Sequence, residues 1–507
     1  MKKIRILIFG AGSMGARFYR LNRWRYQVVG FLDNDPEKAG TRLFNKPVYA
    51  AQKLSDIHYD KIVITSDYQS EIYSQLLNDL GVNEDKIESY VFKPVSSLEK
   101  QFNRLSDLKF RVLLNTPAFL LPLINQLFFR QSGLSLKPLV WLDELDSKKV
   151  SVLREAQQGV TVGPNFIGKG AKIKDVTIPE VALYHLKNTQ VGSVGRSFIL
   201  NNGYIAVERV TTAITDRADY SARHLVMHNH RNGLVRETQS QKIEKGILIN
   251  GVSETNYYHW MIEILSQLQY VNELQEVYKD FPLLIPAWVN KIQSVRDFFV
   301  NFDINRPLIF LDNLNAYQVE NLLIISTPNF HVPHLSGLPR EQVENSYLRP
   351  ESIDFLKGIG LNARAYKTSR EHLPRLFLAR KHGKRNYNQD EVYSLLKNYD
   401  FKQVFLEDLS FVDQVDLFQN ADIIVGPPGA AWSNLLFCKK GSKALSWVAE
   451  EIGDSSCFSN IANYLDVRLD YIAFYSGRED SKDLYMADYN INQQDIRSWI
   501  ERECDTR

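Results

Sequence analysis

The stretch that decides the fold is ADIIVGPPGAAWSNLLF, residues 421–437. A short, mainly apolar run leads directly into the turn Gly426-Pro427-Pro428-Gly429, and an apolar helical pattern follows at once. Such a strand is typical of a parallel sheet covered on both faces. Ligands of these sheets bind beyond the carboxyl ends of the strands, which is where the turn lies. We therefore expect a doubly wound α/β domain around this strand.

The turn itself allows two interpretations. Gly429 can adopt backbone conformations closed to other residues, and the two prolines stiffen the chain before it. Ala430 would let a ligand approach the following helix, while Ser433 and Asn434 add polar side chains near its start. Amides at a helix start suit a phosphate or a sugar. Alternatively, the glycines only permit a tight strand-to-helix connection.

A basic cluster follows the neighbouring predicted strand, in RLFLARKHGKRNYNQDE, residues 375–391. Arg380, Lys381, Lys384 and Arg385 fall at the carboxyl end of that strand and in one loop. Guanidinium groups bind phosphate oxygens in pairs, so the cluster suits a diphosphate. The other interpretation is a solvated basic loop.

The first 95 residues predict a separate small α/β domain. The apolar run IRILIF precedes Gly10, Gly12 and Gly15, and a second strand ends at Asp33, 18 residues after Gly15. Strand, glycine turn, helix, strand and acidic residue form the dinucleotide fingerprint. Only about one mononucleotide-binding half is present, so we expect the domain to bind NAD, a nucleotide sugar or no ligand.

Composition excludes several classes of function. A net charge of +2 argues against a general nucleic-acid binder, which usually carries a basic excess. The start MKKIRILIFGAG ends its apolar run in a glycine turn without a cleavage pattern, so we expect a cytoplasmic location. The cysteines are too few and too scattered for a disulfide framework or a zinc site. They are Cys438, Cys457 and Cys504.

Residues 112–129, VLLNTPAFLLPLINQLFF, carry no charge and are flanked by Arg111 and Arg130. Their length is marginal for a transmembrane span, and their prolines and amides make a poor one. Three interpretations stay open: a span, an interfacial helix with peripheral contact to the inner membrane, and a packed helical linker.

Three motifs, in this order, resemble glycosyltransferase family 61 over about residues 181–450. They are NYYHWMIE (256–263), LFLARKHGKRNYNQDE (376–391) and FLEDLSFVDQVDLFQNADIIVGPPGAAWSNLLF (405–437). The resemblance implies a GT-B architecture with two Rossmann-like halves, a nucleotide-sugar donor, inversion at the anomeric carbon and no required metal.

The predicted fold class is therefore α/β, with an N-terminal Rossmann-like domain followed by a GT-B-type transferase. We predict four parts along the chain. They are a nucleotide-binding domain (1–95), a helical connector (96–180), an acceptor-side half (181–345) and a donor-side half with its tail (346–507).

For the catalytic base, the resemblance directs attention to His259 and Glu263, which are four residues apart and share one helix face. Either could be the base with the other orienting it, or the two could form a purely structural pair. His228 and His230 are weaker candidates for acceptor contacts. The predicted donor-binding residues are Arg380, Lys381, Arg385, Gly429, Ala430, Ser433 and Asn434; Glu407 and Gln414 match further family positions.

Two positions depart from the family pattern: Pro428 replaces a usual histidine, and Ser446 a common acidic residue. We predict an inverting, metal-independent hexosyl- or pentosyltransferase. It would move a sugar to a glycan or lipid-linked glycan of a bacterial capsule or O-antigen. The alternative is a non-catalytic scaffold that binds nucleotide sugar. A third interpretation, an NAD-dependent sugar-modifying N-terminal domain, lacks a Tyr-x-x-x-Lys motif.

Overall fold

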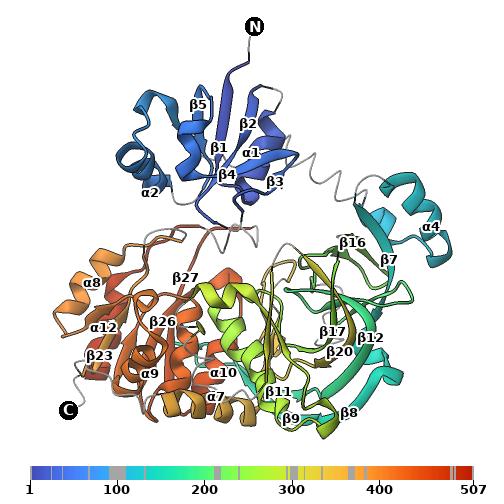
Figure 1. Ribbon diagram of the computed structural model, residues 1–507. Helices are drawn as coiled ribbons and strands as arrows, with labels where there is room; N and C mark the ends of the chain where they lie inside the picture. Colours follow the sequence, from blue (N-terminus) through green and yellow to red (C-terminus); the bar gives the residue numbers. More distant parts are fainter. Residues whose placement is uncertain are drawn as a thin grey trace. The chain divides into compact units, whose positions relative to one another are not determined.

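The chain separates into two compact units, residues 1–108 and 109–507 (Figure 1). A computed structural model gives the structure. It describes residues 3–504 apart from 24, 37, 67–68, 91–109, 131–132, 210–217, 238–239, 293–294, 297–305, 313–314, 333–334, 364–371, 382–384, 480–483 and 485–486.

The described part of the first unit contains a six-stranded sheet in the order β3-β4-β2-β1-β5-β6. Its strands are parallel except β3, which pairs antiparallel with β4. The glycine turn connects β1 to α1, as the fingerprint predicts. The elements are β1 (Arg5–Phe9), α1 (Ser13–Asn22), β2 (Gln27–Asp33), β3 (Arg42–Leu43), β4 (Lys46–Ala50), β5 (Lys61–Ile64), α2 (Gln69–Ser74) and β6 (Ile87–Ser89).

The C-terminal part of the second unit is built on a parallel sheet, in the order β10-β27-β26-β25-β23-β24 (Figure 1). Residues 421–437 form β25, the glycine turn and a 3₁₀ helix, Ala430–Phe437. The strands are β10 (Asn165–Phe166), β23 (Arg375–Leu378), β24 (Lys402–Val404), β25 (Ile423–Val425), β26 (Lys443–Ala449) and β27 (Arg468–Phe474).

Helices cover both faces of this sheet, because its strands are apolar on both sides. Leu376 and Leu378 pack into one apolar cluster with residues of α7, α9 and α10, while Phe377 packs into another with residues of α8 and α12. The doubly wound prediction is confirmed for this part of the chain. The helices are α7 (Pro350–Ala363), α8 (Gln389–Lys397), α9 (Phe411–Asn420), α10 (Cys457–Tyr464) and α12 (Gln493–Cys504).

The other part of the second unit is a mixed sheet, eleven-stranded within the described residues. Its long strand β12 pairs antiparallel with β20, which in turn pairs in parallel with β17. The strands are β7 (Leu134–Trp141), β8 (Lys149–Arg154), β12 (Val181–Gly192), β13 (Ser197–Ile199), β14 (Ile205–Val207), β15 (Leu225–His228), β16 (Asn232–Arg236), β17 (Ser240–Leu248), β18 (Leu283–Pro286), β19 (Leu308–Leu311) and β20 (Ala316–Ile325).

This sheet corrects two expectations. Residues 134–178 are largely strands rather than part of a helical connector; they include the hairpin of β9 (Gln157–Val162) and β11 (Ile173–Ile178). In addition, the acceptor-side half is not a second parallel Rossmann-like sheet. Its strand order depends on antiparallel pairings between distant segments, which local hydrophobic patterns do not reveal.

The two sheets share one core. Buried residues from β12, β17, β20, β23, β25 and β26 join a single apolar cluster. Most of the helical segment of residues 257–271 is buried in that cluster. The segment that carries NYYHWMIE is therefore held between both sheets.

Candidate active site

The segment of residues 257–271 places the predicted acid–base pair. Its stretch His259–Ile264 is a π-helix, and it continues through a 3₁₀ turn into α5 (Leu268–Val271). His259 Nδ1 lies 2.8 Å from Glu263 Oε2, and both side chains are buried. The pairing expected from the four-residue spacing is present. π-Helical turns are rare and frequently occur at functional sites.

Glu263 uses both of its carboxylate oxygens. Oε2 accepts from His259, while Oε1 accepts from the backbone N–H of His331 at 2.7 Å. A carboxylate fixed in this way selects the tautomer of His259 that carries its proton on Nδ1. The arrangement leaves Nε2 of His259 as the ring nitrogen that can accept a proton.

A second histidine–carboxylate pair lies beside the first. His331 Nε2 is 3.4 Å from Glu341 Oε1, and the His331 ring stacks near His259 with 6.2 Å between ring centroids. Burial alone would lower the pKa of His331, but the Glu341 and Glu263 carboxylates outweigh it, and the net pKa is raised. Sequence reasoning missed this pair, because no spacing or motif links His331 to Glu341.

A cavity of about 1320 Å³ within residues 111–471 brings several predicted residues together. His259, Arg385, Gly429 and Ala430 all line it, with His331 beside them. A large concave site with converging polar groups is the usual form of a substrate pocket. The same cavity also includes His228, His230, Glu341, Ser446 and Cys457.

Arg380, in contrast, stabilises the Gly-Pro-Pro-Gly turn and does not line the cavity. Its guanidinium donates to the carbonyls of Pro428 and Arg385, and a Cβ on Gly429 would lie 3.3 Å from its Nη2. Its own backbone N–H donates to Gln389 Oε1 at 2.7 Å. Arg380 therefore holds the Gly-Pro-Pro-Gly turn against the loop that carries Arg385.

The remaining predicted donor residues lie outside the cavity lining. Lys381 is half-exposed and pairs with Asp408. Asn434 is buried; its Oδ1 accepts from the Tyr257 hydroxyl at 2.9 Å, and its Nδ2 donates to Gln414 Oε1 at 2.9 Å. Asn434 therefore connects the start of the helical segment of residues 257–271 to the parallel-sheet half. Ser433 is buried next to it, Glu407 lies in the middle of a short 3₁₀ turn, and Lys384 lies outside the described residues.

Two further cavity residues have their protonation set by burial. His228 Nε2 accepts the backbone N–H of Tyr220 at 2.9 Å, and burial lowers the pKa of His228, so its ring is neutral. Burial raises the pKa of the Cys457 thiol, which is therefore not a thiolate nucleophile.

Several cavity residues have buried polar atoms with no hydrogen-bond partner among the residues that the structure describes. Three of these atoms are the Tyr258 hydroxyl, His331 Nδ1 and the Ser446 hydroxyl. Buried polar groups in native proteins are normally satisfied by protein, water or ligand. Their common location on this cavity favours a polar ligand.

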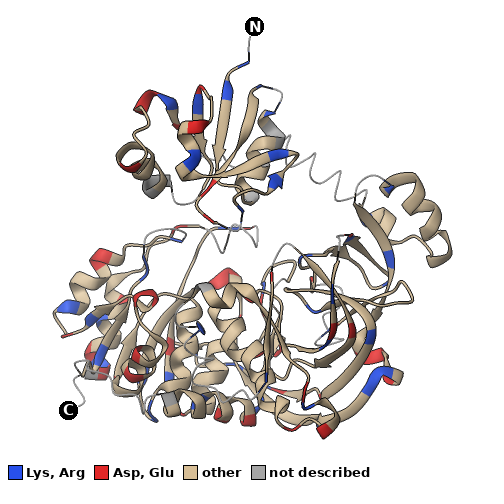
Figure 2. Ribbon diagram, viewed as in Figure 1, with Lys and Arg blue, Asp and Glu red and all other residues tan. Residues whose placement is uncertain are grey.

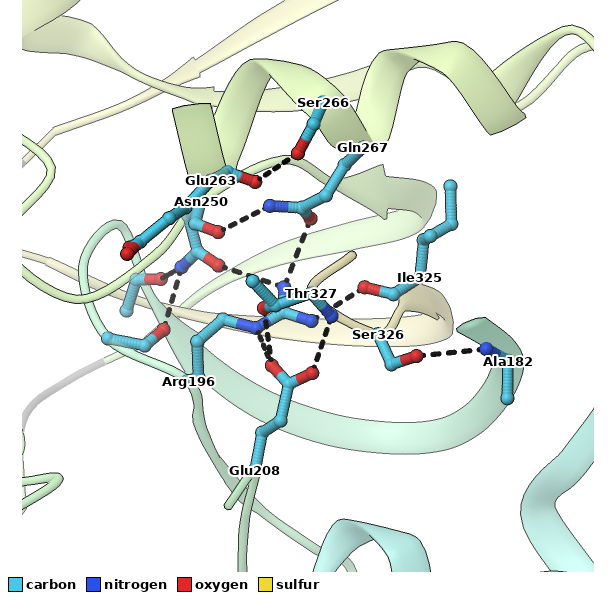
Figure 3. A network of polar contacts seen from close by, with 12 residues as sticks. Ala182, Arg196, Glu208, Asn250, Glu263, Ser266, Gln267, Ile325, Ser326 and Thr327 are labelled. Carbon is cyan, nitrogen blue, oxygen red and sulfur yellow. Dashed lines mark hydrogen bonds and ion pairs between the residues drawn. The ribbon is translucent and has the colours of Figure 1, made fainter. Parts of the chain in front are cut away.

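A buried polar network supports the helical segment of residues 257–271 from the mixed sheet (Figure 3). Arg196 pairs with Glu208, and Glu208 also accepts from the backbone and hydroxyl of Thr327. Arg196 donates further to Gln267, whose amide donates to the Asn250 carbonyl at 3.0 Å. The network therefore extends from the sheet to the end of the helical segment that contains Glu263.

The glycine turn of the first unit has a separate geometry. A Cβ on Gly15 would lie 1.8 Å from the Gly10 carbonyl, so Gly15 allows α1 to pack on the turn; a Cβ on Gly12 would meet nothing within 4 Å. The Asp33 carboxylate accepts from the Ala11 amide at 2.8 Å and from Lys38 at 3.0 Å. Asp33, the acidic residue of the fingerprint, is thus already hydrogen-bonded to the glycine turn.

Neither a metal cluster nor a membrane span was found in the part of the chain that the structure describes. It contains no group of three or more His, Cys, Asp or Glu side chains that could hold a metal ion. None of its helices is both long and apolar enough to cross a bilayer.

Family models match both units. One described as Glycosyltransferase 61 matches residues 257–445, from the start of the helical segment that carries His259 to a point within β26. Residues 257–445 belong to glycosyltransferase family 61. Another model, described as C2185-like, N-terminal, matches residues 2–88. The family-61 segment contains His259, Glu263, Arg385 and Gly429 and ends one residue before Ser446.

Comparison with solved structures returned proteins that resemble about a fifth of the chain. UDP-D-quinovosamine 4-dehydrogenase from Vibrio fischeri is 20% identical over 20% of this chain and 85% of its own, with a TM-score of 0.16. RSP, a Rex-family repressor, is 16% identical over 22% of this chain and 64% of its own, with a TM-score of 0.16. RSP in complex with beta-NADH is 16% identical over 22% of this chain and 65% of its own, again with a TM-score of 0.16. No curated protein matched the chain.

Proposed function

We propose that residues 109–507 form an inverting glycosyltransferase that moves a hexosyl or pentosyl unit from a nucleotide sugar to a glycan acceptor. The acceptor proposed from the sequence is a growing bacterial surface polysaccharide, a capsule or an O-antigen. The mixed-sheet half would take the acceptor and the parallel-sheet half the donor, which are the roles of the two halves in a GT-B enzyme.

In this proposal His259 Nε2 removes the proton from the acceptor hydroxyl, and Glu263 orients the ring and stabilises the imidazolium. The acceptor oxygen then bonds to the anomeric carbon while the bond from that carbon to the diphosphate oxygen breaks. Arg385 and the amides of Gly429 and Ala430 stabilise the departing nucleoside diphosphate. Arg380 positions the turn rather than touching the donor.

One observation carries the proposal. His259, which is paired with Glu263, lines the same cavity as Arg385 and the Gly429 turn, so a base and an anion-binding region can reach one substrate. A nucleophile's base and a leaving-group site must converge in this way for an in-line displacement. Neither a solvated basic loop nor a structural pair in an apolar core would require that convergence.

The test begins with donor binding. Calorimetric titration of the full chain with UDP-, GDP- and CMP-sugars identifies the donor, and transfer or slow hydrolysis of that donor is then measured. We expect His259→Gln to lower kcat by about a hundredfold to ten-thousandfold, as for removal of a general base. Its Kd for the donor should stay within about twofold, because uniform binding does not depend on the base.

His185→Gln is the matched control, since His185 lies in β12 outside the cavity lining and should keep full activity. Full transfer activity in His259→Gln would contradict the assigned base. No binding of any nucleotide sugar by the folded wild type would contradict the transferase itself.

A non-catalytic nucleotide-sugar scaffold is the second candidate, and Ser446 is the observation that favours it. Its hydroxyl lies buried on the cavity, where the family commonly has an acidic residue. Without a carboxylate there, a donor hydroxyl would lose a strong acceptor. Donor binding without transfer or hydrolysis, in the wild type and in Ser446→Asp alike, would favour the scaffold.

For the first unit we propose nucleotide binding at the glycine turn, to NAD or a nucleotide sugar. The support is the open space above Gly12, which allows a phosphate to approach the start of α1. A Gly12→Val variant should lose the binding of NAD(H) or nucleotide sugar to residues 1–108 without loss of folding.

A further inference from the structure

Residues 110–129 have an unusual surface, because their outer side is apolar as well as their inner side. Leu114, Leu121 and Phe129 pack against β7 and β16 in a small apolar cluster. On the opposite side, Phe119 is 80% exposed and Leu127 is 66% exposed. Val112, Leu120 and Leu123 are also exposed. We call these five exposed side chains the apolar patch.

A helical segment that is apolar all round is normally buried, either in a protein core or in a membrane. The patch is neither, because α4 (Leu121–Ile124) and its flanking turns project from the sheet beside β7 (Figure 1). None of these turns is long enough to span a bilayer. The geometry therefore suits a segment that lies on a lipid surface with its outer side inserted.

The charges around the apolar patch indicate which kind of lipid surface it suits. No charged residue occurs between Arg111 and Arg130, and both arginines are exposed and make no ion pair among the described residues. The ribbon around α4 is accordingly tan in Figure 2. Exposed apolar side chains framed by cationic ones complement an anionic lipid surface, which attracts each basic residue near it.

The apolar patch is also connected to the candidate active site. Asn232 Nδ2 donates to the carbonyls of Leu114 and Thr116 at 2.6 and 2.8 Å, which fixes this part of the segment on the β15–β16 hairpin. That hairpin carries His228, and the cavity extends from His259 to Arg111 and Asn115 at the base of the patch. One end of the cavity is therefore held at the segment that bears the patch.

We propose that the apolar patch docks the protein on an anionic lipid membrane and holds the Arg111–Asn115 end of the cavity at that surface. If the proposed transferase function holds, this end is where a lipid-anchored glycan acceptor would enter. The docking itself needs no transferase activity, so the two proposals can fail separately.

The test is flotation of the full-length protein with lipid vesicles. The probes are vesicles of phosphatidylcholine alone and of phosphatidylcholine with about 30 mol % phosphatidylglycerol. We expect wild-type protein to float with the anionic vesicles. Leu127→Glu should lower the bound fraction about tenfold or more, because a charge replaces an exposed apolar side chain that would insert into the lipid. Arg130→Gln should lower it about fivefold at low salt.

Ile173→Glu is the matched control, because Ile173 is 65% exposed but lies in β11, away from the patch. It should float like the wild type. Phe119→Ser is a second patch variant that adds no charge, and it should also reduce flotation. Thermal unfolding of each variant identifies any that fails to fold.

Three results would overturn the proposal. Wild-type protein could stay unbound with both vesicles, or Ile173→Glu could lose as much binding as Leu127→Glu. Alternatively, ultracentrifugation could show a wild-type dimer that dissociates in Leu127→Glu, which would make the patch an interface between two copies of the chain.

Discussion

Glu254 is a buried carboxyl two residues before Asn256, a residue of the cavity lining. Burial raises its pKa from 4.5 to about 7, although Arg223 opposes the shift. Its contribution to stability is therefore fully present below pH 4.5 and is lost as pH rises through 7. We expect Glu254→Gln to unfold with a free energy about 3 kcal/mol higher than wild type at pH 8. At pH 5 the gain should fall below about 1 kcal/mol.

Urea unfolding at the two pH values measures this difference. Asp219→Asn, an exposed carboxyl on the same cavity, is the control and should show little pH-dependent change. A loss of stability in Glu254→Gln at pH 8 would mean that an ion pair with Arg223 outweighs the cost of burial.

Arg380 and Arg385 of the basic cluster have different neighbours, so we expect their substitutions to affect different properties. Arg385 lines the cavity with a backbone φ of 58°, a conformation that asparagine tolerates. Arg385→Asn should therefore raise the Kd for the donor about tenfold or more and leave the melting temperature unchanged. Arg380→Ala should lower stability by about 1–3 kcal/mol, because the carbonyls of Pro428 and Arg385 lose their donor.

Calorimetric titration and thermal unfolding distinguish the two effects. Lys381→Ala serves as the control for a nearby charge, since Lys381 is half-exposed and pairs with Asp408. Equal changes in donor Kd for Arg385→Asn and Lys381→Ala would contradict direct contact by Arg385.

These residues also show how far the sequence predicts the site. The spacing of His259 and Glu263 was enough to predict their pairing, since four residues span about one helical turn. Arg380, in contrast, was predicted as a phosphate ligand, but its partners are backbone carbonyls that no motif specifies. His331 and Glu341 were missed because their contact depends on tertiary structure alone.

At the scale of elements, the buried network beside the helical segment of residues 257–271 should have a large effect on stability (Figure 3). Arg196 and Glu208 are both almost fully buried, and removal of one partner leaves an unpaired charge in the core. We expect Arg196→Met to lower the free energy of unfolding by about 3–5 kcal/mol. Transfer activity should fall as well, because Arg196 donates to Gln267 in the helical segment of residues 257–271, which carries the proposed base His259.

Urea denaturation of Arg196→Met and of the double variant Arg196→Met/Glu208→Leu tests this expectation. The double variant should recover part of the loss, since it removes the unpaired carboxylate. If the two variants are equally destabilised, the loss comes from packing rather than from the buried charge.

Elements also differ in how well they could be predicted. Residues 423–425 and 375–378 are continuous apolar runs followed by helical patterns, and they are strands of the parallel sheet. Residues 134–178 lack this alternation of apolar strand and helical pattern. Their strands pair with strands that are distant in the sequence: β8 pairs with β12, and β10 pairs with β27. Local patterns predict strands of a βαβ unit, because each strand and helix is consecutive, but they do not predict long-range strand partners.

At the scale of the molecule, the chain has two compact units, so we expect two separable unfolding transitions. We expect the transferase donor to bind to only one of these units. All residues that line the cavity belong to residues 109–507. Gly15 belongs to the first unit, where an added Cβ would lie 1.8 Å from the Gly10 carbonyl. Gly15→Ala in the full chain should therefore lower the melting temperature of the first unit by several degrees. The transition of residues 109–507 should not move.

Differential scanning calorimetry with and without the nucleotide sugar found to bind the wild type makes the measurement. A ligand that binds only a folded unit raises the melting temperature of that unit. The donor should stabilise residues 109–507 equally in wild type and in Gly15→Ala. Gly12→Ala is the matched control, because its Cβ would meet nothing within 4 Å and no transition should shift without ligand. Loss of donor stabilisation in Gly15→Ala would instead place the donor on the glycine turn, because the cavity of the second unit is unchanged by that substitution.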